Sequence, residues 1–214
     1  MSIVVPAVND ESNQNENADQ FAPFADKMAD AGLPQLAIDS FKYYYDQLHS
    51  GETGFIDSET AQPVAELPDA TQLSAYRGEG EEALSRTVVL RLNGGLGTSM
   101  GMTGPKSLLK VKEELSFLDI IVQQVLSMRK QYDIRLPLIL MNSFNTSDAT
   151  EATLATYPEL KQSIPFGFLQ HKVPKILKES MAPADWPKVP EKEWCPPGHG
   201  DLYAALITLS LIHI

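Results

Sequence analysis

A run of β-branched and aliphatic residues that ends in glycines decides the fold of this chain: TVVLRLNGGLG, residues 87–97. Such a run is typical of a buried strand, and the glycines after it predict a loop. A second strand is predicted over residues 136–141, which read LPLILM. Between the two strands, apolar residues at helical spacing predict a helix over residues 116–130, with Ser116 as its cap.

The order strand, loop, helix, strand is that of a βαβ unit, whose right-handed crossover places the two strands parallel in one sheet. A further helix is predicted over residues 149–155 and a further strand over residues 164–170, so the alternation continues. The sequence therefore predicts an α/β fold with a mainly parallel sheet.

The residues before this unit have a different character. Residues 1–20 are too polar to bury the apolar area that would offset the entropy of ordering them, so we expect a disordered tail there. Apolar residues return at helical spacing from Phe21, and a second helix is predicted over residues 36–48. We therefore expect a helical appendage and connector over residues 21–85, followed by the α/β domain over residues 86–208.

The composition excludes several classes of protein. Of the 214 residues, 43% are hydrophobic and 21% charged, which excludes collagen-like, wholly disordered and coiled-coil proteins. No apolar run is long enough for a membrane helix and the start is acidic, so we expect a soluble, cytoplasmic protein with no membrane partner. The single cysteine, Cys195, excludes an internal disulfide and a zinc-finger-like site.

The charge is distributed unevenly along the chain. The net charge of -11 is concentrated in residues 1–85, whereas residues 86–214 are nearly neutral. Local phosphate binding is therefore compatible with the second part of the chain. A nucleic-acid partner is not expected, because no basic stripe is visible.

The loop after the first strand carries the chemical signal. Five glycines between residues 94 and 104 leave main-chain amides free to point at an anion, which suits phosphate. A Walker A loop is excluded because Pro105 separates the last of these glycines from Lys106. The dinucleotide fingerprint is a poor match, because the spacing from Gly97 to Gly101 is one residue too long.

The whole loop, LNGGLGTSMGMTGPKS over residues 92–107, resembles the UTP–glucose-1-phosphate uridylyltransferase (UDP-glucose pyrophosphorylase) family. Three further segments match that family in the same order: LMNSFNT at residues 140–146, Gln170 followed by VPKI at residues 173–176, and PPGHGDLY at residues 196–203. The resemblance extends from about residue 20 to residue 208. It implies a Rossmann-like nucleotidyltransferase domain of the GT-A-like kind, of which residues 86–208 would form a part.

Two alternatives to glucose specificity stay open. Pyrophosphorylases for N-acetylhexosamines, or with broad UDP-sugar specificity, are similar but usually have Ala-Gly-Gly-Gln-Gly-Thr-Arg in the loop and Asn at the position of His199. Asn93, Ser99 and His199 favour the glucose branch. The other alternative is a non-catalytic nucleotide-binding module.

The resemblance implies a role for each matching residue. Main-chain groups of the first loop residues would hold UTP, and Lys106 would place a positive charge on its phosphates as the catalytic residue. The full set implied to bind UTP is Leu92, Asn93, Gly94, Gly95, Lys106, Met141, Gln170 and Gly198. Met141 and Gln170 would line the uracil and ribose side, although Met141 is equally well explained by packing. His199 would reach the glucose 1-phosphate.

The implied reaction converts UTP and α-D-glucose 1-phosphate to UDP-glucose and diphosphate. It needs Mg²⁺, which the nucleotide would bring, and the resemblance places the protein's metal ligand and a C-terminal β domain in a part that this chain lacks. The family's chains are longer, and residues 209–214 depart from its pattern, so we expect these six residues to be non-native. The chain by itself is expected to be inactive. The resemblance implies no oligomeric state.

Overall fold

The computed structural model describes residues 11–52 and 54–209, which form two compact units. One unit takes its described residues from Met1–Phe55, His171–Pro197 and Leu206–Ile214, and the other takes them from Ile56–Gln170 and Gly198–Ala205. This division differs from the expected boundary at residue 85, because a late segment of the chain packs with the first helices.

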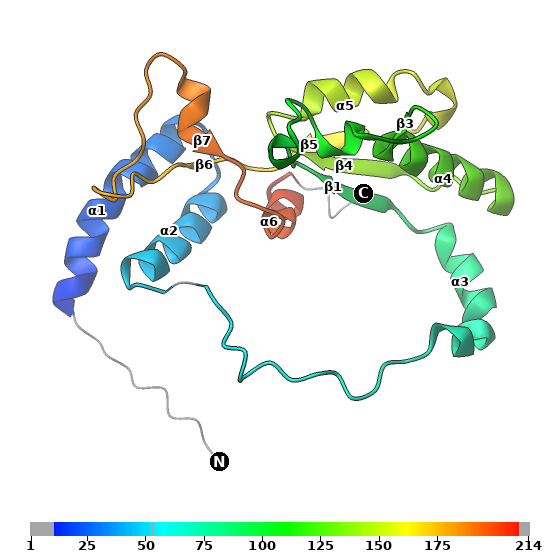
Figure 1. Ribbon diagram of the computed structural model, residues 1–214, viewed down its shortest axis with the longest axis horizontal. Helices are drawn as coiled ribbons and strands as arrows, with labels where there is room; N and C mark the ends of the chain where they lie inside the picture. The colour runs from blue at the N-terminus through cyan, green and yellow to red at the C-terminus, as the bar shows by residue number, and fades with distance from the viewer. Residues whose placement is uncertain (1–10, 53, 210–214) are drawn as a thin grey trace. The chain divides into compact units, whose positions relative to one another are not determined.

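The second unit is built on a parallel sheet, as predicted (Figure 1). Its strands are β1 (Val89–Asn93), β4 (Leu138–Asn142) and β5 (Gly167–Leu169), in the order β1-β4-β5. Both pairings are parallel. The expected α/β fold is therefore confirmed.

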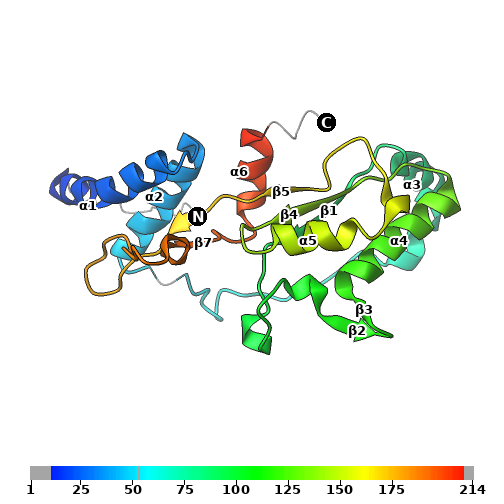
Figure 2. The same cartoon turned by 90° about the horizontal axis from the view of Figure 1, so that it is seen from above.

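Two helices cover one face of this sheet. Figure 2 shows α4 (Phe117–Tyr132) and α5 (Ser147–Leu154) on the same side. Consecutive right-handed crossovers in one direction place their helices on one face, which explains the arrangement. The core contains the buried residues Leu118, Val122, Val125, Leu138, Leu140, Leu154 and Leu160.

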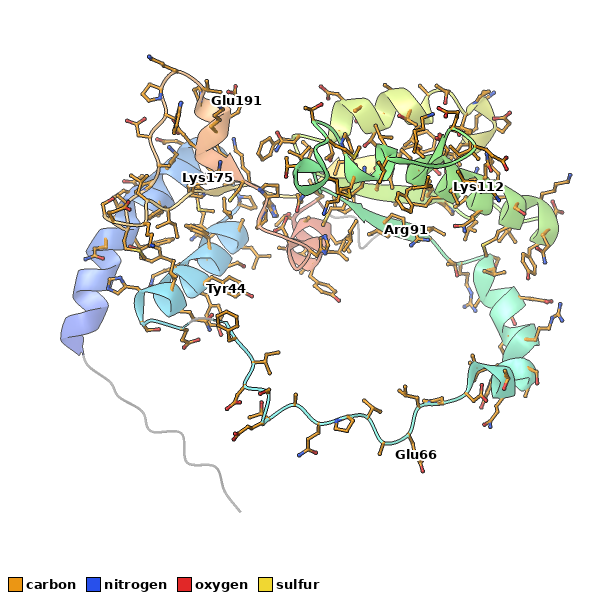
Figure 3. The ribbon with its side chains drawn as sticks, viewed as in Figure 1. Tyr44, Glu66, Arg91, Lys112, Lys175 and Glu191 are labelled. Atoms are coloured by element: carbon orange, nitrogen blue, oxygen red, sulfur yellow. The ribbon has the colours of Figure 1, made fainter. Side chains whose placement is uncertain are left out.

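The first unit is a helical pair packed against a late segment. Its helices α1 (Glu11–Asp30) and α2 (Gln35–His49) bury the aromatic residues Phe21, Phe24 and Tyr45. Trp194 of the late segment packs against this cluster. Tyr44 points to solvent instead (Figure 3).

An ion pair joins the two parts of this unit. Lys27 of α1 pairs with the buried carboxylate of Glu193, and its ammonium also donates to the carbonyl of Ala184 at 3.0 Å. The Lys27 hydrogen bond and a further one from the Trp186 amide lower the pKa of Glu193. The ionised carboxylate therefore ties α1 to residues far away in the sequence.

The start of α1 differs from the prediction. The helix begins at Glu11, so residues 11–20 of the expected tail are helical, and residues 1–10 lie outside the described part. A helix already nucleated by a packed apolar face extends at little further cost, because each added residue gains one hydrogen bond.

The remaining elements are short. The connector contains η1 (Ala70–Tyr76) and α3 (Arg77–Leu84), and α6 (Asp201–Thr208) is the last described helix. The other short elements are η2 (Thr98–Met100), η3 (Lys106–Leu108), β2 (Lys110–Lys112), β3 (Leu115–Ser116), η4 (Pro158–Leu160), β6 (Val173–Pro174), η5 (Pro190–Glu193) and β7 (Trp194–Cys195). Among the described residues, no helix has the length and apolar character needed to cross a membrane.

The start of α4 is fixed by a capping box. The hydroxyl of Ser116 accepts from the amide of Asp119 at 3.2 Å, and the Asp119 carboxylate accepts from the Ser116 amide at 2.7 Å. The same carboxylate accepts from the hydroxyl of Tyr157, which follows α5, at 2.7 Å. Burial opposes the charge of Asp119, but the hydrogen bonds from Tyr157 and Ser116 outweigh it and lower its pKa. Burial, followed by the hydrogen bond to Asp119, raises the pKa of Tyr157 to about 12.

Replacing Ser116 by alanine should lower the free energy of unfolding by about 1 kcal/mol, because an N-cap hydroxyl contributes that much. Urea unfolding followed by circular dichroism measures the change. Ser163→Ala is the control, since the exposed Ser163 side chain makes no hydrogen bond to any other described residue. Equal stability of the two variants would contradict the role of the cap.

The charge of Asp119 should make stability depend on pH. Because its pKa is lowered in the folded state, its contribution is complete above the usual value of 3.8 and is lost as the pH falls through the lowered pKa. Wild type should therefore exceed Asp119→Asn in stability at about pH 6, with the difference shrinking below about pH 4. Urea unfolding at a series of pH values measures this difference, and Asp185→Asn, which changes an exposed carboxylate, is the control. A difference that does not vary with pH would contradict the prediction.

Candidate functional site

The glycine-rich loop leaves the carboxyl end of β1 and folds back on itself. The Gly97 amide donates to the carbonyl of Gly104 at 3.0 Å, and the Lys106 amide donates to the carbonyl of Gly95 at 3.0 Å. A β-bridge between Leu96 and Pro105 lies between these two bonds. The loop is thus a closed hairpin-like turn that brings Lys106 beside Gly95, although ten residues separate them.

Lys106 is exposed, and its side chain lies along the start of the loop. A β-carbon built on Gly95 would lie 3.8 Å from Cδ of Lys106, so the aliphatic stem passes close to this glycine. Among the described residues, no carboxylate pairs with the Lys106 ammonium. The loop therefore carries a positive charge that is available to an anion.

Gln170 lies directly against the loop from the end of β5. A β-carbon built on Gly94 would lie 1.9 Å from Nε2 of Gln170, so any larger residue at this position would require the Gln170 side chain to move. The Gln170 side chain is buried, and its Oε1 has no hydrogen-bond partner in the described part of the chain. Because an unpaired buried acceptor is costly, this oxygen is suited to accept a hydrogen bond from a ligand.

The side chain of Asn93 points into the protein instead of toward the loop's open side. It is buried, and its Nδ2 donates to Oδ1 of Asn142 at 2.7 Å and to Oγ1 of Thr150 at 2.8 Å. Because both protons of Nδ2 are used inside the protein, this amide group is not free to donate to a nucleotide. The Gly94 carbonyl is already occupied, since it accepts from the hydroxyl of Ser143 at 2.9 Å.

Leu92 and Met141 are neighbours in the β1–β4 register but differ in exposure. Leu92 is 40% exposed, so it can contact a ligand. Met141 is fully buried on the central strand. Its burial agrees with packing, the alternative reading of this residue, better than with a nucleotide contact.

Gly198 and His199 belong to the same compact unit as the loop. Both are exposed, and Gly198 has a positive φ of 108°, which favours glycine. Their carbonyls accept hydrogen bonds from Asp201 and Leu202 at the start of α6. Neither residue makes a hydrogen bond to the glycine loop in the part of the chain that the structure describes. The structure therefore brings together Gly94, Gly95, Lys106 and Gln170 but does not connect His199 to them.

Three polar residues near the loop were not assigned a role from the sequence. These are Asn142, Ser143 and Thr150, and the first two lie in the LMNSFNT segment. All three are buried and within hydrogen-bonding distance of Asn93 or Gly94. Polar residues directly after an apolar strand were the available signal, because the ends of parallel strands meet at one edge of the sheet.

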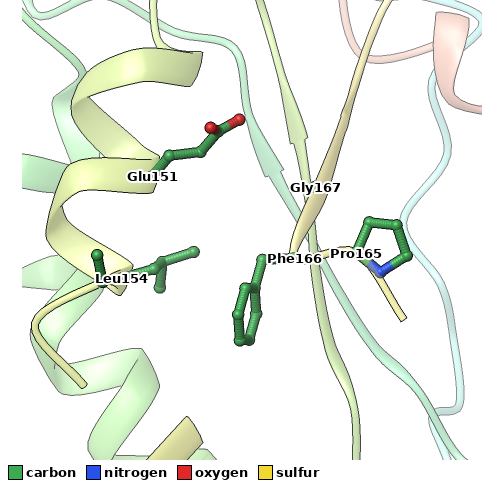
Figure 4. Close-up of a pocket in the computed structure, with 6 residues that line it drawn as sticks. Glu151, Leu154, Pro165, Phe166 and Gly167 are labelled. Atoms are coloured by element: carbon green, nitrogen blue, oxygen red, sulfur yellow. The ribbon is translucent and has the colours of Figure 1, made fainter. Parts of the chain in front are cut away.

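A pocket elsewhere in this unit does not involve the predicted site. Figure 4 shows it between α5 and β5, lined by Glu151, Leu154, Ala155, Pro165, Phe166 and Gly167. None of these residues belongs to the set expected to bind UTP.

The described residues do not fit a protein-held metal site. No group of three or more histidine, cysteine, aspartate or glutamate side chains within residues 11–52 and 54–209 is placed to hold a metal ion.

Comparisons with known proteins identify the family of this chain. The model of the family described as UTP–glucose-1-phosphate uridylyltransferase matches residues 38–213. The curated enzyme of that name from Solanum tuberosum is 37% identical over 190 residues, which cover 85% of this chain and 40% of the potato protein. UTP–glucose-1-phosphate uridylyltransferase 2 from Dictyostelium discoideum is 45% identical over 137 residues, which cover 61% of this chain and 26% of that protein.

Solved structures confirm the nucleotidyltransferase fold. A mutant of UDP-glucose pyrophosphorylase from Leishmania major, in complex with UDP-glucose, has a TM-score of 0.79 and 40% identity over 87% of this chain and 39% of its own. A UDP-glucose phosphorylase from Trypanosoma brucei has a TM-score of 0.76 and 35% identity over 91% of this chain and 40% of its own. The chain thus spans 40% or less of the length of these relatives. Because the family model matches most of its length, the chain belongs to the UTP–glucose-1-phosphate uridylyltransferase family.

Proposed function

We propose that the protein carrying this chain converts UTP and glucose 1-phosphate to UDP-glucose and diphosphate, and that this chain supplies the nucleotide-binding part. The observation that carries the proposal is the closed loop in which the Lys106 amide binds the carbonyl of Gly95. This bond holds the backbone of Lys106 beside Gly95, and the Lys106 ammonium pairs with no carboxylate among the described residues, an arrangement suited to a chain of phosphates.

The reaction needs alignment more than covalent help from the protein. A phosphate oxygen of glucose 1-phosphate attacks the α-phosphorus of UTP, and a new P–O bond forms. The bond between the α-phosphorus and the bridging oxygen breaks, and its electron pair leaves with diphosphate. Lys106 would offset the negative charge that keeps the two anions apart, while the loop orients the phosphate chain.

Gln170, whose carboxamide lies against Gly94, would recognise the uracil base. Uracil carries one N–H donor flanked by two carbonyls, and Gln170 offers an unpaired acceptor oxygen beside a donor nitrogen. The exposed Leu92 and Gly198 would contact the nucleoside, and the exposed His199 would reach the sugar phosphate.

Two further properties belong to the proposal. Mg²⁺ would arrive on the phosphates of the nucleotide, since this ion is commonly held by substrate phosphates. A cytoplasmic location agrees with the absence of any membrane-spanning helix among the described residues.

The protein expressed from its complete gene should release diphosphate from UTP in the presence of glucose 1-phosphate and Mg²⁺. The rate with N-acetylglucosamine 1-phosphate should be lower by about tenfold or more, because a pocket shaped for a hydroxyl must make room for the larger acetamido group. A coupled diphosphate assay measures both rates. Equal or reversed rates would favour the broad or N-acetylhexosamine specificity, and the absence of calorimetric UTP binding would contradict the proposal as a whole.

The substitution Lys106→Ala in the same protein should lower turnover by about tenfold or more, because it removes a preorganised charge from the phosphate site. Lys112→Ala is the matched control, since Lys112 is an exposed lysine on β2 (Figure 3). If both variants keep the wild-type rate, Lys106 takes no part in the reaction.

A further inference from the structure

A buried polar network joins the start of the glycine loop to β4 and α5. Asn93 ends β1, and its Nδ2 donates to Asn142 at 2.7 Å and to Thr150 at 2.8 Å. One residue later, the Gly94 carbonyl accepts from the hydroxyl of Ser143 at 2.9 Å. Two consecutive loop residues are therefore held by three residues that lie about fifty positions further along the chain.

The hydrogen atoms of this network can be accounted for. The Thr150 hydroxyl donates its only proton to the carbonyl of Thr146 at 2.7 Å, so it receives the hydrogen bond from Asn93 on a lone pair. Asn93 Nδ2 then uses both of its protons, one for Thr150 and one for Asn142. This fixes the orientation of the Asn93 carboxamide.

The residues of this network are buried. Asn142 is 2% exposed, and Ser143 and Thr150 are 0% exposed. Buried hydrogen bonds of this kind favour one arrangement strongly, because breaking one leaves a polar group without a partner. The direction in which the main chain leaves β1 is thus set from β4 and α5.

We propose that Asn142, Ser143 and Thr150 are positioning residues that hold Asn93 and Gly94 in the geometry in which the loop binds the nucleotide. They touch no substrate and act through the loop. The proposal rests on the proposed function for its ligand, UTP, but the loop geometry can also be measured without a ligand.

Thr150→Val tests the proposal with the smallest change in shape. Valine keeps the volume but cannot accept from Asn93, so one buried donor loses its partner. The affinity for UTP with Mg²⁺, measured by calorimetry on the protein expressed from its complete gene, should fall by about tenfold. Amide hydrogen exchange of Gly97 and Lys106, whose N–H groups close the loop, should become faster.

Two variants separate positioning from a general effect on α5. Thr153→Val removes a hydroxyl that only donates to the helix carbonyl of Ala149 at 2.9 Å. This loss matches the loss of the Thr150 hydrogen bond to the carbonyl of Thr146 in Thr150→Val, but it leaves the partners of Asn93 in place. It should leave UTP affinity and loop exchange unchanged. Thr150→Ser keeps the hydroxyl and should restore both to near wild type.

The outcomes distinguish this proposal from the proposed function. If wild type binds UTP and Thr150→Val binds it as tightly as Thr153→Val does, the positioning role is overturned. If wild type does not bind UTP, the proposed function fails, and the exchange of Gly97 and Lys106 decides the positioning role alone. Faster exchange in Thr150→Val than in Thr153→Val would then support it, and equal exchange would overturn it.

Discussion

The parallel pairing of β1 with β4 is the constraint on which the second unit depends. Its register places Asn93 opposite Asn142, so both strands change from apolar to polar residues at the same level of the sheet. Hydrophobic burial along the strands fixes this register, because a shift by one residue would turn the apolar side chains to the opposite face. The position of the glycine loop follows from the packing of the core.

The loop region combines a residue without a side chain, Gly94, with a charged residue, Lys106. Gly94 has no side chain, which lets the Gln170 carboxamide approach it, while Lys106 contributes charge from the end of the same turn. The buried polar groups behind the loop are satisfied by one another, whereas Oε1 of Gln170 has no partner. This contrast is consistent with the proposal that Gln170 contacts the nucleotide.

Much of the fold could be predicted from the sequence, because its signals are local. The apolar runs correctly predicted β1 and β4, and Ser116 correctly predicted the start of α4. The start of α1 was placed too late, because its first turns are polar and extend from packing further along the helix. The packing of residues 171–197 with the first helices was not predicted, since the contact of Lys27 with Glu193 depends on residues remote in sequence.

The site was predicted less completely than the fold. The motif gave Gly94, Lys106 and Gln170, and the structure brings these residues together. It could not show that the Asn93 side chain faces inward or that Met141 is fully buried, because both depend on which face of the sheet each residue takes. The partners of Asn93 could not be predicted, because they lie on β4 and α5, which only the folded chain brings beside β1.

The ion pair between Lys27 and Glu193 has a consequence for folding during synthesis. The two residues are 166 positions apart, so a nascent chain leaving the ribosome contains α1 and α2 long before their partner segment exists. The three strands of the sheet, in contrast, are complete once residue 169 has emerged. The sheet can therefore form first, whereas the contacts of the early helices with Trp194 and Glu193 form only after the late segment has been synthesised.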